Sequence, residues 1–412
     1  MKVALLLHLY QPVYQDKAVF TEVYTSCYLP LLKFIKNKRD FNVTLNVSLS
    51  LLQQMDMYGY TSWVESLKEL VTQDKVELTG SAAYHPLLTK LSEDYMNKQI
   101  VLNEYGVGYY LGRRSGFEGE PAILIKDLNG FFPPELAVSP AVLKTVNELN
   151  YKWMVVDECA ISGEGLASGV YEIDGIETKI VARNTALSNA ISFKRDSNVT
   201  DIVNMLEANL MDQKHNVIAI DGEVFGHHFK DGMYFLETFV EAVMARGGNF
   251  IKISPLVENS VINKIESIKE STWALTNASS EIYPLWQKNG NLLQKAQWDL
   301  FKVVNEEIVL EDIASMDMSL STAPVWSTSD INAVEDPVLR NNMLKHISIL
   351  QSQNSDQFWW ASGETLPNDV VLSSTLMVRN SLEIYSNIIQ YITEDTLKEK
   401  LQEKIKDVES CL

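Results

Sequence analysis

Cysteine is scarce in this chain, and basic residues are outnumbered by acidic ones. The chain has 412 residues but only three cysteines, Cys27, Cys159 and Cys411, whose spacing fits neither a zinc motif nor a disulfide framework. This scarcity indicates a reducing compartment, and we expect a cytoplasmic protein.

Lysine and arginine total 35 against 54 aspartates and glutamates, which gives a formal net charge of −19. Such a surface repels phosphate backbones, so nucleic acid is not the expected partner.

Long apolar runs are also missing. No stretch approaches the roughly 20 apolar residues that a membrane helix needs, so we expect no association with a membrane. The apolar segment at the start of the sequence is too short for a signal peptide, and polar groups between His8 and Pro12 interrupt it. We interpret this segment as a buried strand.

Short apolar segments dominate the first 221 residues instead. Seven of them are predicted to be strands: Val3–Leu9, Val43–Ser50, Val76–Thr79, Gly130–Pro133, Trp153–Val156, Thr178–Ala182 and Val217–Ile220. Several are continuous apolar runs, a pattern typical of parallel strands that are covered on both faces. Amphipathic stretches at 29–38, 63–73 and 140–150 separate several of the strands. This alternation predicts an α/β fold with a parallel barrel, one strand short of the common eight.

The periodicity becomes helical after Pro255. Apolar residues recur at helical spacing at Leu293, Ala296, Leu300 and Val303, and again at Leu397, Leu401, Ile405 and Val408. We therefore predict two domains, an incomplete (β/α)7 barrel over residues 1–255 and a helical region over residues 256–412 that closes one side of the site.

Polar side chains gather where five of the predicted strands end. The segments are His8–Pro12, Glu77 with Gly80–Pro86, Pro133–Glu135, Asp157–Glu158 and Asp221–His228. In a parallel barrel the carboxyl ends of the strands share one face, and that face carries the active site. We expect these residues to line one pocket.

Glu135 and Asp221 suit the chemistry of glycoside hydrolysis. That reaction needs one ionised carboxylate that attacks the anomeric carbon and one protonated carboxyl group for the leaving oxygen. Clustered carboxylates raise one another's pKa values, which supplies the proton donor. The alternative is that Glu135 caps the helix that begins near Ser139, and the residues alone do not decide between the two.

Four ordered motifs resemble those of glycoside hydrolase family 57. They are His-Leu-Tyr-Gln-Pro at 8–12, Val-Glu-Leu-Thr-Gly at 76–80, Phe-Phe-Pro-Pro-Glu-Leu-Ala at 131–137 and Asp-Gly-Glu-Val-Phe-Gly at 221–226, with a weaker match at 355–360. The resemblance implies a (β/α)7 barrel followed by helices, α-glucan substrates and a retaining mechanism. It implies that Glu135 is the nucleophile and Asp221 the general acid/base, and that His8 and Glu77 line the subsite where the sugar is cleaved.

The first motif departs from the family at Tyr10, where the family usually has histidine. A tyrosine can still donate a hydrogen bond and stack on a sugar, but it cannot carry the charge of an imidazolium. The departure leaves the catalytic pair intact and bears on which substrate is bound.

Further residues are predicted to contact the substrate. This set comprises Tyr10, Gln11, His85, Glu223, His227, Trp359 and Trp360, with Trp326, Arg183, Ser188 and Asn189 as weaker candidates. One of Trp359 and Trp360 is expected to stack on a sugar, because two consecutive tryptophans should point in different directions.

Asp157 and Glu158 either support Glu135 or face solvent. Adjacent histidines such as His227 and His228 rarely bind one ion, so we predict neither a metal nor a cofactor.

The preferred function is a retaining glycoside hydrolase that cleaves α-1,4-glucosidic bonds in an α-glucan or malto-oligosaccharide, as an α-amylase does. A 4-α-glucanotransferase would use the same carboxyl pair and differ only in the acceptor. A non-catalytic carbohydrate-binding homologue is disfavoured because both carboxyl groups are present. A polysaccharide deacetylase would need a metal-binding His/Asp set that the sequence does not offer. The sequence gives no indication of the oligomeric state.

Overall fold

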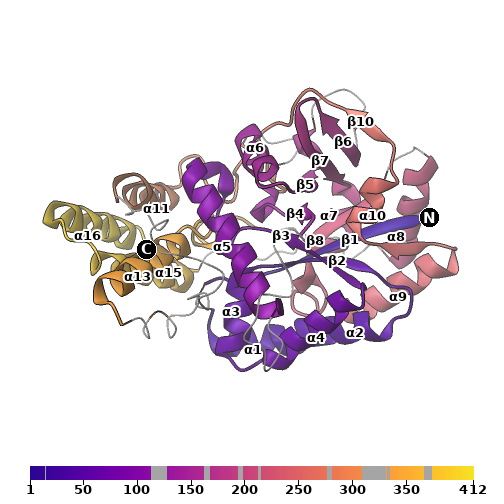
Figure 1. The fold of residues 1–412 in the computed structure, drawn as a ribbon, viewed down its shortest axis with the longest axis horizontal. Helices are drawn as coiled ribbons and strands as arrows, with labels where there is room; N and C mark the ends of the chain where they lie inside the picture. The colour runs from indigo at the N-terminus through magenta and orange to yellow at the C-terminus, as the bar shows by residue number, and fades with distance from the viewer. Residues whose placement is uncertain are drawn as a thin grey trace.

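A mostly parallel sheet surrounded by helices forms the larger part of the molecule, and a group of helices lies at one end (Figure 1). The structure, a computed structural model, describes residues 1–13, 15–112, 128–161, 168–193, 198–211, 215–275, 281–308, 331, 335–365 and 374–412. The strands are β1 (Lys2–Leu9), β2 (Val43–Val47), β3 (Val76–Gly80), β4 (Gly130–Phe131), β5 (Trp153–Asp157), β6 (Gly169–Ile173), β7 (Ile176–Arg183), β8 (Asn216–Asp221), β9 (Asn249–Ile251) and β10 (Ile262–Lys264).

The helices before residue 260 cover the outside of this sheet, except the last of them, which packs against its inner side. They are α1 (Lys17–Val23), α2 (Leu29–Asn37), α3 (Leu49–Met57), α4 (Thr61–Thr72), α5 (Glu93–Gly112), α6 (Pro140–Glu148), α7 (Thr185–Phe193), α8 (Val199–Met211), α9 (Gly232–Ala245) and α10 (Ile253–Glu258). The later ones are α11 (Leu292–Lys302), α13 (Pro337–Ser352), α14 (Asp356–Trp359), α15 (Thr375–Ile389) and α16 (Asp395–Ser410).

The sheet has the strand order β10-β6-β7-β5-β4-β3-β2-β1-β8, with β9 also beside β1. All seven predicted strands are present, and each pairs in parallel with its neighbours among the seven. No ladder joins β7 to β8 in the described part of the chain, but the two strands approach each other. The Asn184 amide donates to the Val217 carbonyl at 2.8 Å, and the Arg183 guanidinium donates to the Ala219 carbonyl at 2.7 Å. The sheet therefore curls into an incomplete barrel, as the sequence predicts.

Three details differ from the prediction. The segment predicted to run as a strand to Ser50 leaves the sheet at Val47, because the Ser48 side chain accepts the Leu51 amide and caps α3. Strand β6 is antiparallel to β7, and the two join through a turn in which Gly175 has φ 81°. The short strands β6, β9 and β10 carry too few apolar residues for the pattern to reveal them.

The barrel interior changes character from one end to the other. Along β1, Val3, Leu5, Leu7 and Leu9 face the surrounding helices, whereas the alternate residues Ala4 and Leu6 pack inside the barrel. Ile253 and Leu256 of α10 join this inner cluster and fill its lower end. The next inward residue of β1 is His8. The interior is thus apolar at the amino end of the strands and polar at the carboxyl end.

The C-terminal helices share a second apolar core. Leu300, Val303, Leu401, Ile405 and Val408 are all buried in it, which confirms the helical periodicity read from the sequence. α13 packs against α15 and α11 against α16, and the same core includes Tyr84 and Leu102 from the barrel part. The predicted boundary at residue 255 stays a prediction; after it the chain adds β10 to the sheet before α11 begins.

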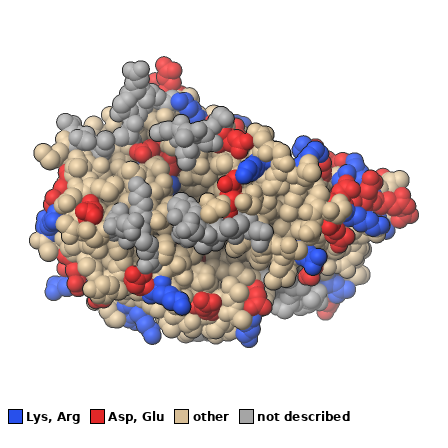
Figure 2. Space-filling view, turned by 180° about the vertical axis from the view of Figure 1, so that it is seen from behind, with Lys and Arg blue, Asp and Glu red and all other residues tan. Residues whose placement is uncertain are grey.

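The surface seen from behind carries acidic and basic groups side by side (Figure 2). They are densest over the projecting end of the C-terminal helices, where Lys398, Lys400 and Lys404 each pair with a nearby carboxylate. Within the described ranges, no helix combines the length and the apolar character needed to cross a membrane.

Candidate active site

The parallel register brings five polar side chains together at the carboxyl end of the barrel. His8 of β1 lies opposite Asn46 of β2 on one side and opposite Asp221 of β8 on the other. Asp157 of β5 lies opposite Arg183 of β7. Because side chains alternate along a strand, these residues continue the inward-facing rows that begin with Ala4 and Leu6. The strand ends therefore meet at one face, as the sequence predicts.

Glu135 occupies a strained turn directly after β4. It lies in the short helix η4 (Pro134–Leu136) with φ 60° and ψ 14°, a left-handed conformation that costs a residue other than glycine on the order of 1–3 kcal/mol. The residue as a whole is 7% exposed. The Trp273 amide donates to the Glu135 carbonyl at 3.1 Å, which helps to hold the turn. The hypothesis that Glu135 only caps a helix finds no support here, because Ser139 caps α6.

A hydrogen-bonded chain reaches the Glu135 carboxylate from the C-terminal helices. The Ser355 hydroxyl donates to Glu135 Oε1 at 2.9 Å. Since that hydroxyl gives its proton to Glu135, it must accept from His85, whose Nδ1 lies 3.0 Å away. His85 is itself left-handed, with φ 55°. Two strained residues and one serine thus fix the carboxylate.

The two histidines of the site leave the same ring atom, Nε2, without a partner in the described part of the chain. His8 Nδ1 donates to Asn46 Oδ1 at 2.6 Å, and Asn46 is fixed in turn by a bond from its amide nitrogen to Thr79. His8 Nε2 and His85 Nε2 are both buried and have no hydrogen-bond partner among the described residues. Burial lowers the pKa of His8 to about 4, so its ring is neutral near pH 7. Each Nε2 is therefore an acceptor suited to a hydroxyl group.

Three carboxyl groups act on one another in this site. Loss of surrounding water raises the pKa of Asp221 to about 7, and Arg183 opposes that rise while the charge of Asp356 adds to it. Loss of water also raises the pKa of Asp356 to about 6, against a hydrogen bond of 2.5 Å from the Tyr10 hydroxyl. Burial raises the pKa of Glu135 well above its usual range; the charges of Asp356 and Asp221 add to this, and the Ser355 bond opposes it.

Arg183 is the cation of the site. Its Nε donates to Asp157 Oδ2 at 2.7 Å, and the guanidinium carbon lies 5.6 Å from the centre of the Trp273 ring. Asp157 is fully buried and also accepts from Thr185 at 2.9 Å. Asp157 thus orients Arg183, and the prediction that it faces solvent is wrong; that it supports Glu135 stays a prediction. Ser188, a weak substrate-binding candidate, accepts the Ala219 amide at 3.4 Å instead.

Glu223 and Gln11 form a buried hydrogen-bonded network through Tyr28. Glu223 Oε1 accepts from the Tyr28 hydroxyl and from the Tyr10 amide, and Gln11 Nε2 donates to the same Tyr28 hydroxyl at 2.9 Å. Burial, together with the charge of Asp221, raises the pKa of Glu223 to about 8. The bonds tie the first motif to the fourth and hold the loop that follows Asp221.

The structure does not bring Glu77 to this group. Glu77 lies opposite Thr44, one inward layer below Asn46, and its carboxylate accepts from the amides of Ile253 and Ser254 at 2.9 and 3.2 Å. An acidic side chain at a helix N-terminus satisfies amides that have no partner within the helix. Glu77 therefore fastens α10 inside the barrel.

His227 lies on the side of α1. The charge of Glu22, one of the residues of that helix, raises its pKa against the lowering caused by burial. Its Nδ1 is buried without a partner among the described residues. Across those residues no group of three or more His, Cys, Asp or Glu side chains is arranged to hold a metal ion.

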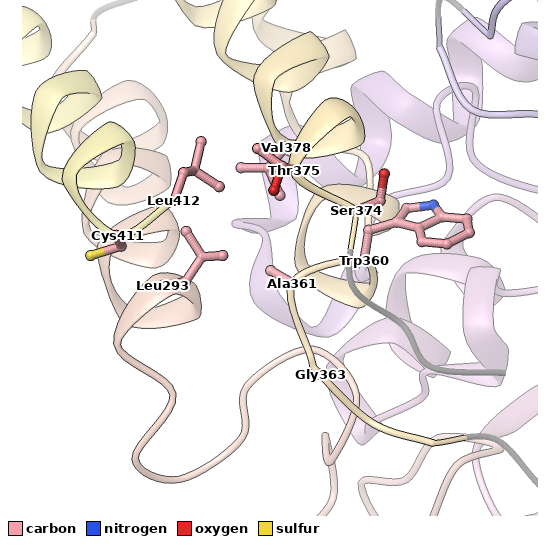
Figure 3. A pocket seen from close by; sticks show the side chains of 9 residues that line it. All are labelled: Leu293, Trp360, Ala361, Gly363, Ser374, Thr375, Val378, Cys411 and Leu412. Atoms are coloured by element: carbon pink, nitrogen blue, oxygen red, sulfur yellow. The ribbon is translucent and has the colours of Figure 1, made fainter. Parts of the chain in front are cut away.

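The two consecutive tryptophans point in different directions, as expected. Their rings meet at 74°, and both are half-buried. Trp359 packs against an aromatic cluster that contains Leu87 and Ala137, each two residues beyond a residue of the site. Trp360 lines a cavity of about 180 Å³ between the C-terminal helices, which Leu293 and Leu412 border from the other side (Figure 3). Trp326 lies outside the described residues.

Ser355 and Asp356 are the residues that sequence reasoning missed. Both belong to the weak C-terminal motif at 355–360, in which the aromatic pair was singled out and the two polar residues before it were not. Ser355, which contacts Glu135, lies 220 positions after it in the sequence. Only the polar character of the pair ahead of an aromatic run could have drawn attention to them.

The pattern that defines Glycosyl hydrolase family 57 matches residues 3–269 of this chain. The chain belongs to this family. Similar proteins include the alpha-amylase of Pyrococcus abyssi and the 4-alpha-glucanotransferase of Thermococcus litoralis, each 24% identical over 229 residues. These alignments cover 53% of this chain and 32% of each relative, so the chain spans about a third of the length of the curated relatives it matches.

Solved structures of the family share the fold. A family 57 type branching enzyme from Pyrococcus horikoshii superposes with a TM-score of 0.64 at 13% identity, over 100% of this chain and 96% of that one. The 4-alpha-glucanotransferase of Thermococcus litoralis superposes with a TM-score of 0.63 at 18% identity, over 95% of this chain and 58% of that one. The match extends through the C-terminal helices and confirms the predicted fold of an incomplete barrel followed by helices.

Proposed function

We propose that this protein is a retaining glycoside hydrolase that cleaves α-1,4-glucosidic bonds in α-glucans. The observation that carries the proposal is the pair Glu135 and Asp221. Glu135 lies in the turn after β4, Asp221 ends β8 of a family 57 barrel, and the charge of Asp221 adds to the raised pKa of Glu135. Both relatives named above act on α-glucans by their names, an amylase and a glucanotransferase.

The proposed mechanism gives the two carboxyl groups different tasks. Glu135 attacks the anomeric carbon while Asp221 gives its proton to the leaving oxygen, and the sugar becomes β-linked to Glu135. Asp221 then removes a proton from water, which attacks the same carbon and restores the α configuration. A pKa of about 7 suits a group that must give and take a proton near neutral pH. The Ser355 bond supports the ionised form that Glu135 needs.

The surrounding groups suit a neutral, hydroxyl-rich substrate. The unpaired Nε2 atoms of His8 and His85 accept hydroxyl protons without adding charge. In this proposal the C-terminal helices complete the substrate cleft, since they supply Ser355 and Asp356. A 4-α-glucanotransferase, in which a sugar hydroxyl replaces water in the second step, is the alternative, and the similarity to a relative of that name favours it as second candidate.

Products formed from maltoheptaose test the proposal and separate the two candidates. Shorter sugars alone indicate hydrolysis, and a ladder of longer and shorter chains indicates transfer. Glu135→Gln and Asp221→Asn should each abolish or severely reduce the reaction. Glu104→Gln is the matched control, because Glu104 is a buried carboxyl outside the site whose pKa is raised to about 7. Unchanged maltoheptaose with the wild-type protein, or full activity in either site variant, would contradict the proposal.

The stereochemistry of azide rescue tests the assignment of roles. In Asp221→Ala an activated aryl α-glucoside still forms the intermediate, and azide attacking it should give the α-glucosyl azide. In Glu135→Ala azide replaces the nucleophile and should give the β-glucosyl azide. The same anomer from both variants would show that the two roles are wrongly assigned.

A further inference from the structure

Contacts from four parts of the chain fix Tyr10, the residue at which the first motif departs from its family. Its hydroxyl donates to Asp356 at 2.5 Å, and its amide donates to Glu223 at 3.3 Å. Its carbonyl lies 3.1 Å from the Tyr28 hydroxyl, whose proton is shared between this carbonyl and Glu223. Its ring stacks on His85 with centroids 4.0 Å apart and planes at 16°. Tyr10 is therefore held rigidly, with its hydroxyl directed at one carboxylate.

Asp356 is faced by titratable groups from several elements. The Tyr10 hydroxyl at the end of β1 binds Asp356 directly, and the charge of Asp356 acts on Glu135 in the turn after β4 and on Asp221 at the end of β8. His85 reaches the neighbouring Ser355 from the loop after β3. Among these, the Tyr10 hydroxyl supplies the hydrogen bond that stabilises the ionised Asp356 side chain against its loss of water.

The identity of the residue at position 10 decides how much charge remains beside the catalytic pair. A neutral tyrosine hydroxyl binds the Asp356 carboxylate without cancelling its charge. In this chain the negative charge of Asp356 therefore remains, and it favours the protonated form of Asp221 while the charge of Arg183 opposes it.

We propose that Tyr10 is a positioning residue that binds the Asp356 carboxylate, and that Asp356, held as an anion, retains on Asp221 the proton that the leaving group needs. This inference rests on the proposed function, because it assigns a task to the proton of Asp221. It also states a specific electrostatic coupling between three residues, which can be measured in the absence of turnover.

The pH dependence of kcat/KM tests the coupling. In Tyr10→Phe the ring remains, but Asp356 loses its donor and takes up a proton near neutral pH. Glu135 and Asp221 then lose a negative neighbour, so both limbs of the pH profile should move to lower pH by about one unit. Asp356→Asn should produce the same shift, and Tyr10→Phe combined with Asp356→Asn should move the limbs no further.

Tyr151→Phe is the matched control, since Tyr151 donates to the buried Glu104 outside the site. It should leave both limbs in place. Unmoved limbs in Tyr10→Phe, or a further shift in the double variant, would overturn the inference. A role in stability alone would lower the rate at every pH without moving the limbs.

A carbon-13 titration of the aspartate carboxyl signals keeps this test separate from the proposed function. The Asp221 signal should titrate at lower pH in Tyr10→Phe than in the wild type. If the wild-type protein leaves maltoheptaose unchanged while this shift occurs, the coupling stands and the proposed activity falls. If activity is present and the signal does not move, the coupling falls and the activity stands.

Discussion

Ser355→Ala removes the hydroxyl that donates to Glu135, and its effect follows from the charge of the acceptor. A hydrogen bond to a charged group contributes about 1.5–3 kcal/mol, and one pKa unit corresponds to about 1.4 kcal/mol. Loss of the bond should therefore raise the pKa of Glu135 by about 1–2 units. His85 Nδ1 already lies 3.7 Å from Oε1 and can replace part of the bond. We expect a rise near the lower end of this range.

An activated aryl α-glucoside isolates this effect, because its leaving group needs little protonation by Asp221. The attack by Glu135 requires the ionised form, so the acidic limb of kcat/KM should move to higher pH by about one unit, with a loss of about tenfold below that limb. Ser355→Thr keeps the hydroxyl and should restore the limb.

Ser352→Ala provides the matched control. Ser352 is equally buried and donates to the Ile349 carbonyl at 2.7 Å, away from the carboxyl groups. Its loss should lower the free energy of unfolding without moving the limb. If Ser355→Ala and Ser352→Ala leave the limb in the same place, the view that Ser355 stabilises ionised Glu135 is refuted.

Three further predictions concern stability and binding. Burial raises the pKa of Glu223 from 4.5 to about 8, so between these two pH values the folded state holds more protons than the unfolded chain. The free energy of unfolding should therefore fall as the pH rises from about 4.5 to about 8, and calorimetry of Glu223→Gln should show a flatter profile. Trp359→Ala should weaken glucan binding in titration calorimetry, whereas Trp360→Ala should mainly lower the free energy of unfolding, by up to about 3 kcal/mol. An equal loss of stability in both variants with unchanged binding would contradict this. Gly226→Ala should destabilise in urea far more than Gly59→Ala, because both have positive φ but an added Cβ at Gly226 would lie 1.9 Å from a backbone oxygen and at Gly59 would meet open space.

Local patterns predicted most of the barrel. Buried parallel strands are apolar throughout, so Val3–Leu9 and Val217–Ile220 were recognised from composition alone. β2 was extended too far because the alternation continues into α3, and only the capping bond of Ser48 reveals the boundary. β9 and β10 are three residues long, and their pairing depends on neighbours far away in the sequence.

The site was predictable where it belongs to strand ends and unpredictable where it does not. The barrel register places His8 and Asp221 side by side, so a motif at each strand end was sufficient. Glu77 was assigned to the pocket, but its carboxylate satisfies the amides of α10, and no pattern reveals that a helix would fill the barrel from below. Ser355 and Asp356 reach the site only through the packing of helices, which periodicity does not specify.

Arg183 occupies the place where the barrel lacks an eighth strand. In a closed barrel, backbone amides from another strand would satisfy the carbonyl of Ala219, and that position would be electrically neutral. Here the guanidinium satisfies it, and the same group lowers the pKa of Asp221, two residues further along β8. The opening in the barrel thus gives the proton donor a permanent counter-charge. An additional strand would satisfy the Ala219 carbonyl with backbone amides and displace the guanidinium of Arg183. The open edge of the barrel and the acidity of Asp221 therefore both depend on Arg183.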